Sequence, residues 1–166
     1  MTPIERMEVR IRRLEDADAI RHLKARYFTC CDRKDPEGMR DCFAPGNVRI
    51  DYGRIGTFDH RDALVDVFER LGCHPHIVEI HHGVNPDITV LDDTHARGTW
   101  GLHYQMLDTQ ARTLTQLGAT YDDEYRKIDG EWKIAATCCV VTSTLSARYD
   151  GDAPGVLFAG AQPPVA

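Results

Sequence analysis

Apolar residues recur at a helical spacing over the first part of the chain. Ile20, Leu23 and Tyr27 lead to the pair Cys30-Cys31, close to a 3.6-residue period. The earlier apolar positions of the same stretch are Met7, Ile11 and Leu14. The pattern predicts a long N-terminal helical region, and the acidic residues at 16–18 predict an interruption within it.

Two shorter helices are predicted before residue 72, with one strand between them. Asp35-Pro36 is typical of a helix cap followed by proline in the first turn, for a helix over residues 36–43. The alternation at residues 47–52 predicts a strand. Asp59 or His60 is expected to cap the third helix, which Gly72 ends. The apolar face of that helix is Ala63, Leu64, Val67, Phe68 and Leu71.

Every segment after residue 75 has the pattern of a strand. Asp129-Gly130 lies between two alternating segments and predicts a tight hairpin, because both turn residues tolerate a positive φ. Gly101 and Gly118 lie inside long strands and predict bends or bulges. The expected strands are residues 76–82, 87–91, 96–107, 113–128 and 131–145.

Helices followed by a run of strands predict an α+β fold. We expect three helices in the N-terminal half, wrapped by a curved, antiparallel or mixed sheet that forms a cone with one open end. Residues 1–149 are expected to form a single domain. Residues 150–166 are rich in Gly, Pro and Ala and are expected to form an irregular tail.

Charge and composition exclude several classes of protein. The formal net charge is −6 at pH 7, without the basic surface that nucleic-acid binding requires. No apolar run approaches the roughly 20 residues of a membrane span. Residues 1–13 carry alternating acidic and basic side chains instead of the apolar centre of a secretory signal. We therefore expect a cytoplasmic protein that binds neither nucleic acid nor membrane.

The six cysteines contain no C-x-x-C pair, and in a reducing compartment they are expected to act as small apolar residues. One local group has the residue types of a metal site: Cys73, His74, His76, His81 and His82. A second half with ligand spacing is absent from the sequence, and adjacent histidines on a strand point to opposite faces. We expect no metal there.

Asp32 and His81 are the strongest candidates for chemistry. Asp32 ends an apolar helical face, and His81 lies in a predicted strand. A carboxylate that holds the proton on one imidazole nitrogen leaves the other nitrogen free as a base. The residues alone leave open that Asp32 is a solvated carboxylate or helix cap and that His81 is structural.

Three segments resemble the SnoaL-like branch of the NTF2-like superfamily, which includes scytalone dehydratase, bile-acid 7α-dehydratase and hexachlorocyclohexane dehydrochlorinase. They are LKARYFTCCD at 23–32, IHHGVNPDI at 80–88 and DEYRKIDGEWKI at 123–134. The resemblance implies that Asp32 is the carboxylate of a catalytic pair and His81 its general base. It implies that Tyr27 and Tyr52 face the pocket and that His103 falls near a second pocket histidine.

The resemblance implies a cofactor-independent lyase without a metal, most simply a dehydratase acting on a hydrophobic cyclic or aromatic alcohol. Tyr27 stands where the dehydrochlorinase has lysine, and the acidic residue and arginine of the bile-acid enzyme are absent near Tyr104 and Val141. Three alternatives stay open: a C–C lyase releasing a small aldehyde such as formaldehyde from a lignin-derived aryl alcohol, a ketosteroid-type isomerase, and a non-catalytic binding module. The resemblance also implies a homotrimer.

Overall fold

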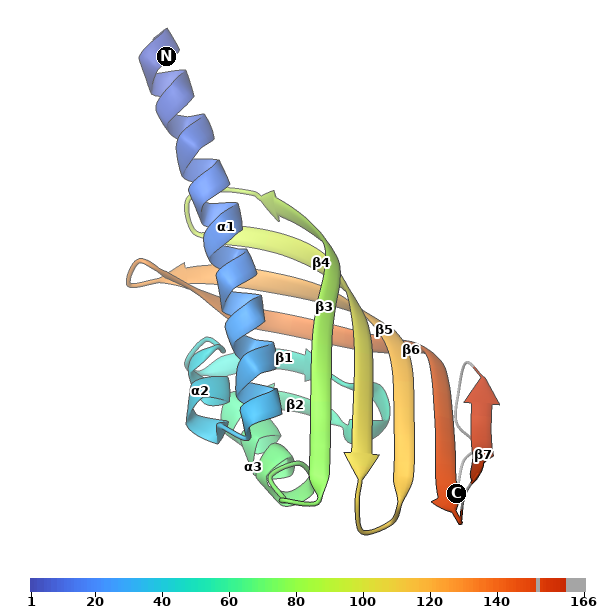
Figure 1. The fold of residues 1–166 in the computed structure, drawn as a ribbon. Coiled ribbons are helices and arrows are strands. Elements are labelled where there is room, and N and C mark those ends of the chain that lie inside the picture. The colour runs from blue at the N-terminus through green and yellow to red at the C-terminus, as the bar shows by residue number, and fades with distance from the viewer. Residues whose placement is uncertain (152, 161–166) are drawn as a thin grey trace.

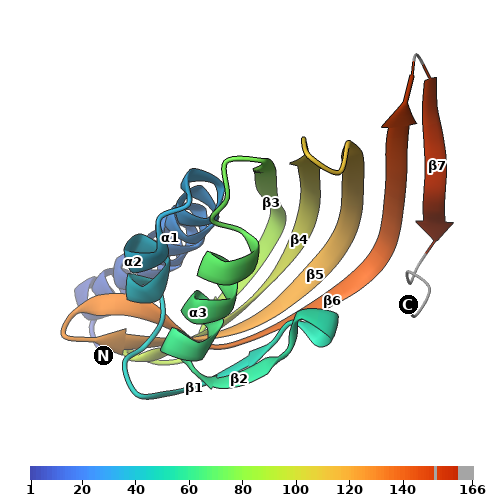
Figure 2. The same ribbon diagram turned by 90° about the horizontal axis from the view of Figure 1, so that it is seen from below.

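A computed structural model describes residues 1–151 and 153–160 as one strongly curved sheet with its helices inside the curve (Figures 1 and 2). The helices are α1 (Pro3–Arg33), α2 (Pro36–Asp41), the 3-10 turn η1 (Gly53–Ile55) and α3 (Arg61–Leu71). The strands are β1 (Asn47–Asp51), β2 (Thr57–His60), β3 (Ile77–Val90), β4 (His95–Asp108), β5 (Thr113–Ile128), β6 (Glu131–Asp150) and β7 (Ala153–Gly160).

The sheet is mixed, in the order β2-β1-β6-β5-β4-β3, with β7 added beside β6. Neighbouring strands are antiparallel except β1 and β6, which run parallel. The long strands β3 to β6 curve around α1, and β1 and β2 lie beneath α3 (Figure 2). The predicted α+β cone, with three helices from the N-terminal half, is confirmed.

Helix α1 is continuous, so the predicted interruption at residues 16–18 is wrong. The helix begins with a capping box, in which Thr2 and Glu5 exchange hydrogen bonds with each other's backbone N–H groups. It ends at Arg33, and the following residue, Lys34, turns the chain out of the helix with a φ of 58°. Asp16 is buried, where it accepts a hydrogen bond from Trp132 Nε1 at 2.9 Å and pairs with Lys127.

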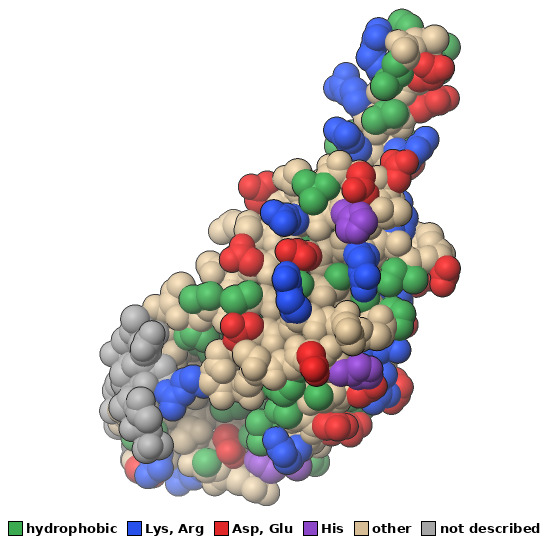
Figure 3. Space-filling view, turned by 180° about the vertical axis from the view of Figure 1, so that it is seen from behind, with side chains coloured by type: hydrophobic (Ala, Val, Ile, Leu, Met, Phe, Trp, Pro, Cys, Tyr) green, Lys and Arg blue, Asp and Glu red, His purple; other side chains and the backbone are tan. Residues whose placement is uncertain are grey.

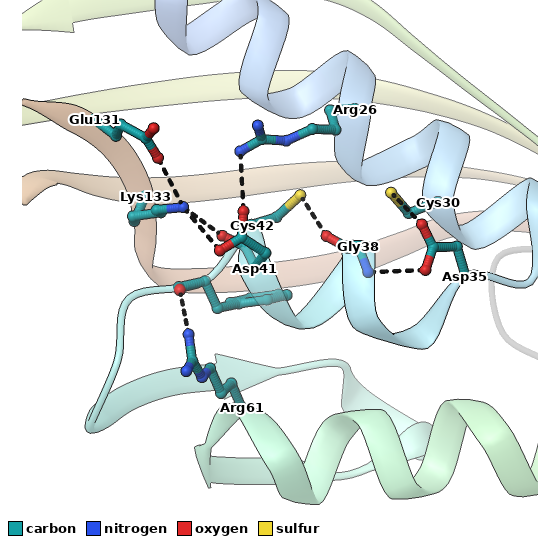
Figure 4. Close-up of polar contacts among 10 residues, drawn as sticks. Arg26, Cys30, Asp35, Gly38, Asp41, Cys42, Arg61, Glu131 and Lys133 are labelled. Atoms are coloured by element: carbon teal, nitrogen blue, oxygen red, sulfur yellow. Dashed lines mark hydrogen bonds and ion pairs between the residues drawn. The ribbon is translucent and has the colours of Figure 1, made fainter.

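Helix α2 is held between α1 and β6 by polar contacts (Figure 4). Asp35 caps it by accepting a hydrogen bond from the Gly38 N–H at 2.9 Å. At its other end, Lys133 Nζ of β6 donates to the Asp41 carbonyl at 2.8 Å. These contacts hold the chain directly after the last turn of α1, the turn that carries Asp32.

The strands differ from the prediction in two places. The two strands expected at residues 76–82 and 87–91 form the single strand β3, with a register shift between Val84 and Asp87 and a φ of 51° at Asn85. Pro86 fits because β3 is an edge strand, where a missing N–H breaks no ladder. Strand β2 was not predicted.

The C-terminal tail is also more regular than predicted. Residues 153–160 form β7, which pairs antiparallel with the end of β6 from Ala153 opposite Asp150 to Gly160 opposite Thr144. The remainder of the predicted irregular tail, residues 152 and 161–166, lies outside the described residues. The sheet therefore extends past residue 149.

The predicted hairpin turn at Asp129-Gly130 is confirmed, with φ values of 51° and 87° that the primed turn requires. Gly118 lies at a register shift between β5 and β6, as expected for a bulge. Among the described residues, no helix has the length and apolar character needed to cross a membrane.

Candidate active site

The end of α1 and the middle of β3 bring Asp32 and His81 into contact. His81 Nδ1 lies 2.6 Å from Asp32 Oδ1, and the His81 backbone N–H also faces the carboxylate, at 3.1 and 3.2 Å from its two oxygens. An ionised carboxylate only accepts, so we assign the ring proton to Nδ1 and leave Nε2 as the free base. The side chains of Asp32 and His81 are 29% and 13% exposed, so the pair is sheltered but not sealed.

A second ion pair lies beside the pair of Asp32 and His81 and also joins the end of α1 to β3. Lys34, two residues after Asp32, forms an ion pair with Glu79, two residues before His81. Residues two apart on a strand point to the same face, so Glu79 and His81 both face α1. Tyr104 of β4 joins the two pairs: its hydroxyl donates to Glu79 Oε1 at 2.7 Å, and its ring lies edge-on to His81, with centroids 4.7 Å apart.

Phe28 covers the other side of the His81 ring. The two rings are stacked, with centroids 5.9 Å apart and planes at 15°. Gly83, on the same face of β3, makes this possible because a Cβ there would lie 2.3 Å from Phe28 Cε2. His81 is therefore held between Phe28 and Tyr104 as well as by Asp32.

Tyr27 and Tyr52 form a second polar group in the site. Their hydroxyl oxygens are 2.8 Å apart, and the Tyr27 ring lies 5.4 Å from Phe28. Burial raises the pKa of both phenols well above the ordinary value, so both remain protonated at neutral pH. Since a contact between two hydroxyls uses only one of their protons, the pair keeps one proton to donate.

His103 does not lie in this site. It pairs with His82 across β3 and β4, and both histidines are exposed on the outer face of the sheet, opposite to α1. The expectation that His103 reaches the pocket is therefore corrected. The inward position is the next residue, Tyr104, which the sequence did not single out.

The sequence matches a model of the SnoaL-like domain over residues 12–137, which is most of the chain. The chain belongs to the SnoaL-like domain family. The matched region includes Asp32, His81 and both tyrosines of the site, and it confirms the family resemblance of the sequence.

Solved structures share the SnoaL-like fold over most of their length. A putative scytalone dehydratase from Novosphingobium aromaticivorans is 23% identical, with a TM-score of 0.72 over 87% of this chain and 94% of that one. A hexachlorocyclohexane dehydrochlorinase from Novosphingobium barchaimii is 17% identical, with a TM-score of 0.70 over 93% and 99%. An NTF-2 like protein of unknown function from Shewanella oneidensis is 12% identical, with a TM-score of 0.62 over 75% and 98%.

A buried ion pair lies beside the aromatic rings of Tyr27 and Phe28 in this SnoaL-like site. Lys24 Nζ is 2.7 Å from Asp123 Oδ2, and both side chains are fully buried. The same carboxylate oxygen accepts from the Tyr125 hydroxyl at 2.7 Å, and Lys24 Nζ lies 3.7 Å from the Tyr121 ring centre. The pair joins α1 to β5 under the site, and no pattern along the chain indicates that this lysine is buried.

A hollow of about 1000 Å³ lies away from the site. Its exposed charged residues include Arg49, Arg97, Asp122 and Glu124, and Arg49 pairs with Glu124 at 3.2 Å. Figure 3 shows this outer face of the sheet, on which acidic and basic side chains are mixed. Neither Asp32 nor His81 lines the hollow, so it offers no route to them.

The local group of cysteine and histidines is dispersed in the SnoaL-like fold. His81 is bound to Asp32, His82 faces outward, and the rings of His74 and His76 stack with centroids 5.3 Å apart. Within residues 1–151 and 153–160, no set of three or more His, Cys, Asp or Glu is arranged to hold a metal ion.

The six cysteines are free thiols, and we predict that most of them react slowly. Burial raises the pKa of Cys30 and of Cys139 to about 11, so almost no thiolate is present at neutral pH. Iodoacetamide should modify Cys73 and Cys138 first and leave Cys30 and Cys31 intact until the protein unfolds. Peptide mapping by mass spectrometry tests this order, and rapid modification of Cys31 in the native protein would contradict it.

Proposed function

We propose that this SnoaL-like protein is a cofactor-independent lyase, most simply a dehydratase that removes water from a hydrophobic cyclic or aromatic alcohol. The observation that carries the proposal is the 2.6 Å contact between Asp32 and His81, which leaves one imidazole nitrogen free. A non-catalytic binding module would have no need for this contact. The dehydratase and dehydrochlorinase among the structural neighbours agree with elimination chemistry.

His81 acts as the base. Its Nε2 takes a proton from a carbon next to the carbinol carbon, and the electron pair of the broken C–H bond forms the new double bond. The resulting imidazolium is stabilised by the Asp32 carboxylate through Nδ1–H. Phe28 and Tyr104, packed against the ring, fix its direction and exclude water from one side of it.

The tyrosine pair acts at the oxygen that leaves. The phenol proton not used between Tyr27 and Tyr52 polarises the C–O bond and passes to the departing hydroxide, so that water is released. The imidazolium proton of His81 then restores the phenol, directly or through the released water. Atoms and charge balance without an oxidant, a reductant or a metal.

A screen of hydroxylated aromatic, alicyclic and steroid compounds tests the proposal, with products followed by mass spectrometry in buffer containing EDTA. Loss of the mass of water, abolished in the His81→Ala variant, supports a dehydratase. A product of unchanged mass identifies an isomerase, and release of formaldehyde identifies a C–C lyase. Binding without turnover of any compound leaves a binding module, and the proposal is then wrong.

We also propose that the protein is a cytoplasmic homotrimer. The outer face of the sheet exposes Val78, Ile80, Val84 and Val140, which supports burial against other copies. A reducing cytoplasm suits the six free thiols. Light scattering at micromolar concentration tests the assembly, and a monomer would contradict it.

A further inference from the structure

The apolar face of α1 changes sides part-way along the helix. In the C-terminal half, buried Ile20, Leu23 and Tyr27 face the sheet. In residues 3–15, which we call the arm, the apolar stripe is Ile4, Met7, Ile11 and Leu14. At about 100° per residue, this stripe is centred about 180° round the helix from the buried one.

The arm projects beyond the sheet (Figure 1), and apolar side chains are exposed along it (Figure 3). Ile4, Met7, Ile11 and Leu14 are between 50% and 71% exposed. The side of the arm that turns toward the body is marked by partly buried Val9 and by the ion pair of Arg12 with Asp93, and buried Asp16 follows on the same side directly after the arm. The stripe thus points away from the chain's own core.

We propose that the arm pairs with the arm of a second copy of this chain as a parallel, two-stranded coiled coil. The stripe has the alternating spacing of three and four residues that such a seam requires, with Ile4 and Ile11 at the a positions and Met7 and Leu14 at the d positions. Isoleucine at a with leucine at d favours two strands over three.

The charges beside the stripe select the partner and its direction. In a parallel pair, Arg10 at a g position faces Glu15 at the following e position of the partner copy, and the reverse contact forms across the seam. An antiparallel pair, with Ile4 opposite Leu14 of the second copy, would instead place Arg10 near Arg10 and Glu8 near Glu8. The arm is therefore complementary to a parallel copy of itself.

Sedimentation over a micromolar concentration series tests the pairing. The full chain is expected to have twice the assembly mass of the Ile11→Glu variant, because glutamate at an a position disrupts the seam. The ratio is two whether the bodies are monomers or trimers, so it does not depend on the proposed homotrimer or the proposed activity. The matched control Arg13→Glu changes the charge by more but lies off the stripe, and it should keep the full mass. A ratio of one, or of three, overturns the proposal.

Charge reversal and cross-linking test the direction. Arg10→Glu alone should weaken the pair, and Arg10→Glu combined with Glu15→Arg should restore it. Under mild oxidation, Ile4→Cys should form a disulfide with the same position of the second copy, because a parallel seam places identical residues opposite each other. Failure of the charge-swapped double variant to restore the mass overturns the parallel pairing. A disulfide between positions 4 and 14 of two copies, in a chain that carries both Ile4→Cys and Leu14→Cys, would overturn it as well.

Discussion

Replacing Asp32 by asparagine is expected to lower turnover by roughly 10²–10⁴, with little change in stability. The amide keeps the size of the side chain but loses the charge that stabilises the His81 imidazolium. Its NH₂ group can also face Nδ1 and favour the wrong tautomer of the ring. Steady-state kinetics on a substrate from the screen, together with a thermal melt, measure the two effects separately.

The control is a comparison of single and double variants of Asp32 and His81, which tests whether the two residues act together. His81→Ala should reduce turnover to a similar level, and the double variant should be little worse than either single one, because the residues act as a unit. Additive losses, or near-normal turnover in Asp32→Asn, would leave Asp32 as a carboxylate at a helix end. The proposed mechanism would then lose the carboxylate that supports its base, while the family membership would stand.

The Lys24→Met variant is expected to cause the largest loss of stability. It leaves the fully buried Asp123 carboxylate without its cation, and breaking a buried ion pair from one side costs about 3–5 kcal/mol. For a chain of this size, that corresponds to a fall in Tm of roughly 6–20 °C. Differential scanning calorimetry measures the change.

Two variants show whether the cause is the unpaired charge. Lys24→Met combined with Asp123→Asn removes both charges and keeps an oxygen to accept from Tyr125, so it should recover more than half of the lost stability. Arg49→Met removes the cation of an exposed pair and should change stability by about 0.5 kcal/mol or less. Equal losses in Arg49→Met and Lys24→Met would exclude burial of the pair as the cause.

The pattern of the chain predicts local structure well and misses what depends on pairing between distant segments. The turn at Asp129-Gly130 follows from residues that tolerate positive φ, and the structure agrees. Strand β7 was missed because its backbone pairs with β6 whatever its Gly, Pro and Ala content. The break expected at residues 16–18 was a change of apolar face within one helix, because the two halves of α1 face different surroundings.

In the candidate site, too, local patterns predict some features, and contacts between distant segments decide the others. Strand parity predicts that only one of His81 and His82 faces inward, and the resemblance selected His81 correctly for contact with Asp32. The register of β3 against β4 places Tyr104 beside His81, and no pattern within either strand gives that register. Glu79 had a usable signal, since it lies two residues before His81 on the same face.

Two contacts between the end of α1 and β3, Asp32 with His81 and Lys34 with Glu79, confine the proposed base and the carboxylate that supports it to residues 32–34 and 79–81. The turns at residues 53–56 and 72–76 include neither these four residues nor the Tyr27–Tyr52 pair, so changes in them are expected to leave the proposed base in position. Laboratory evolution can therefore diversify those turns, and with them the shape offered to substrates, while the base keeps its position. The fold separates the part that carries the chemistry from the parts that are free to vary.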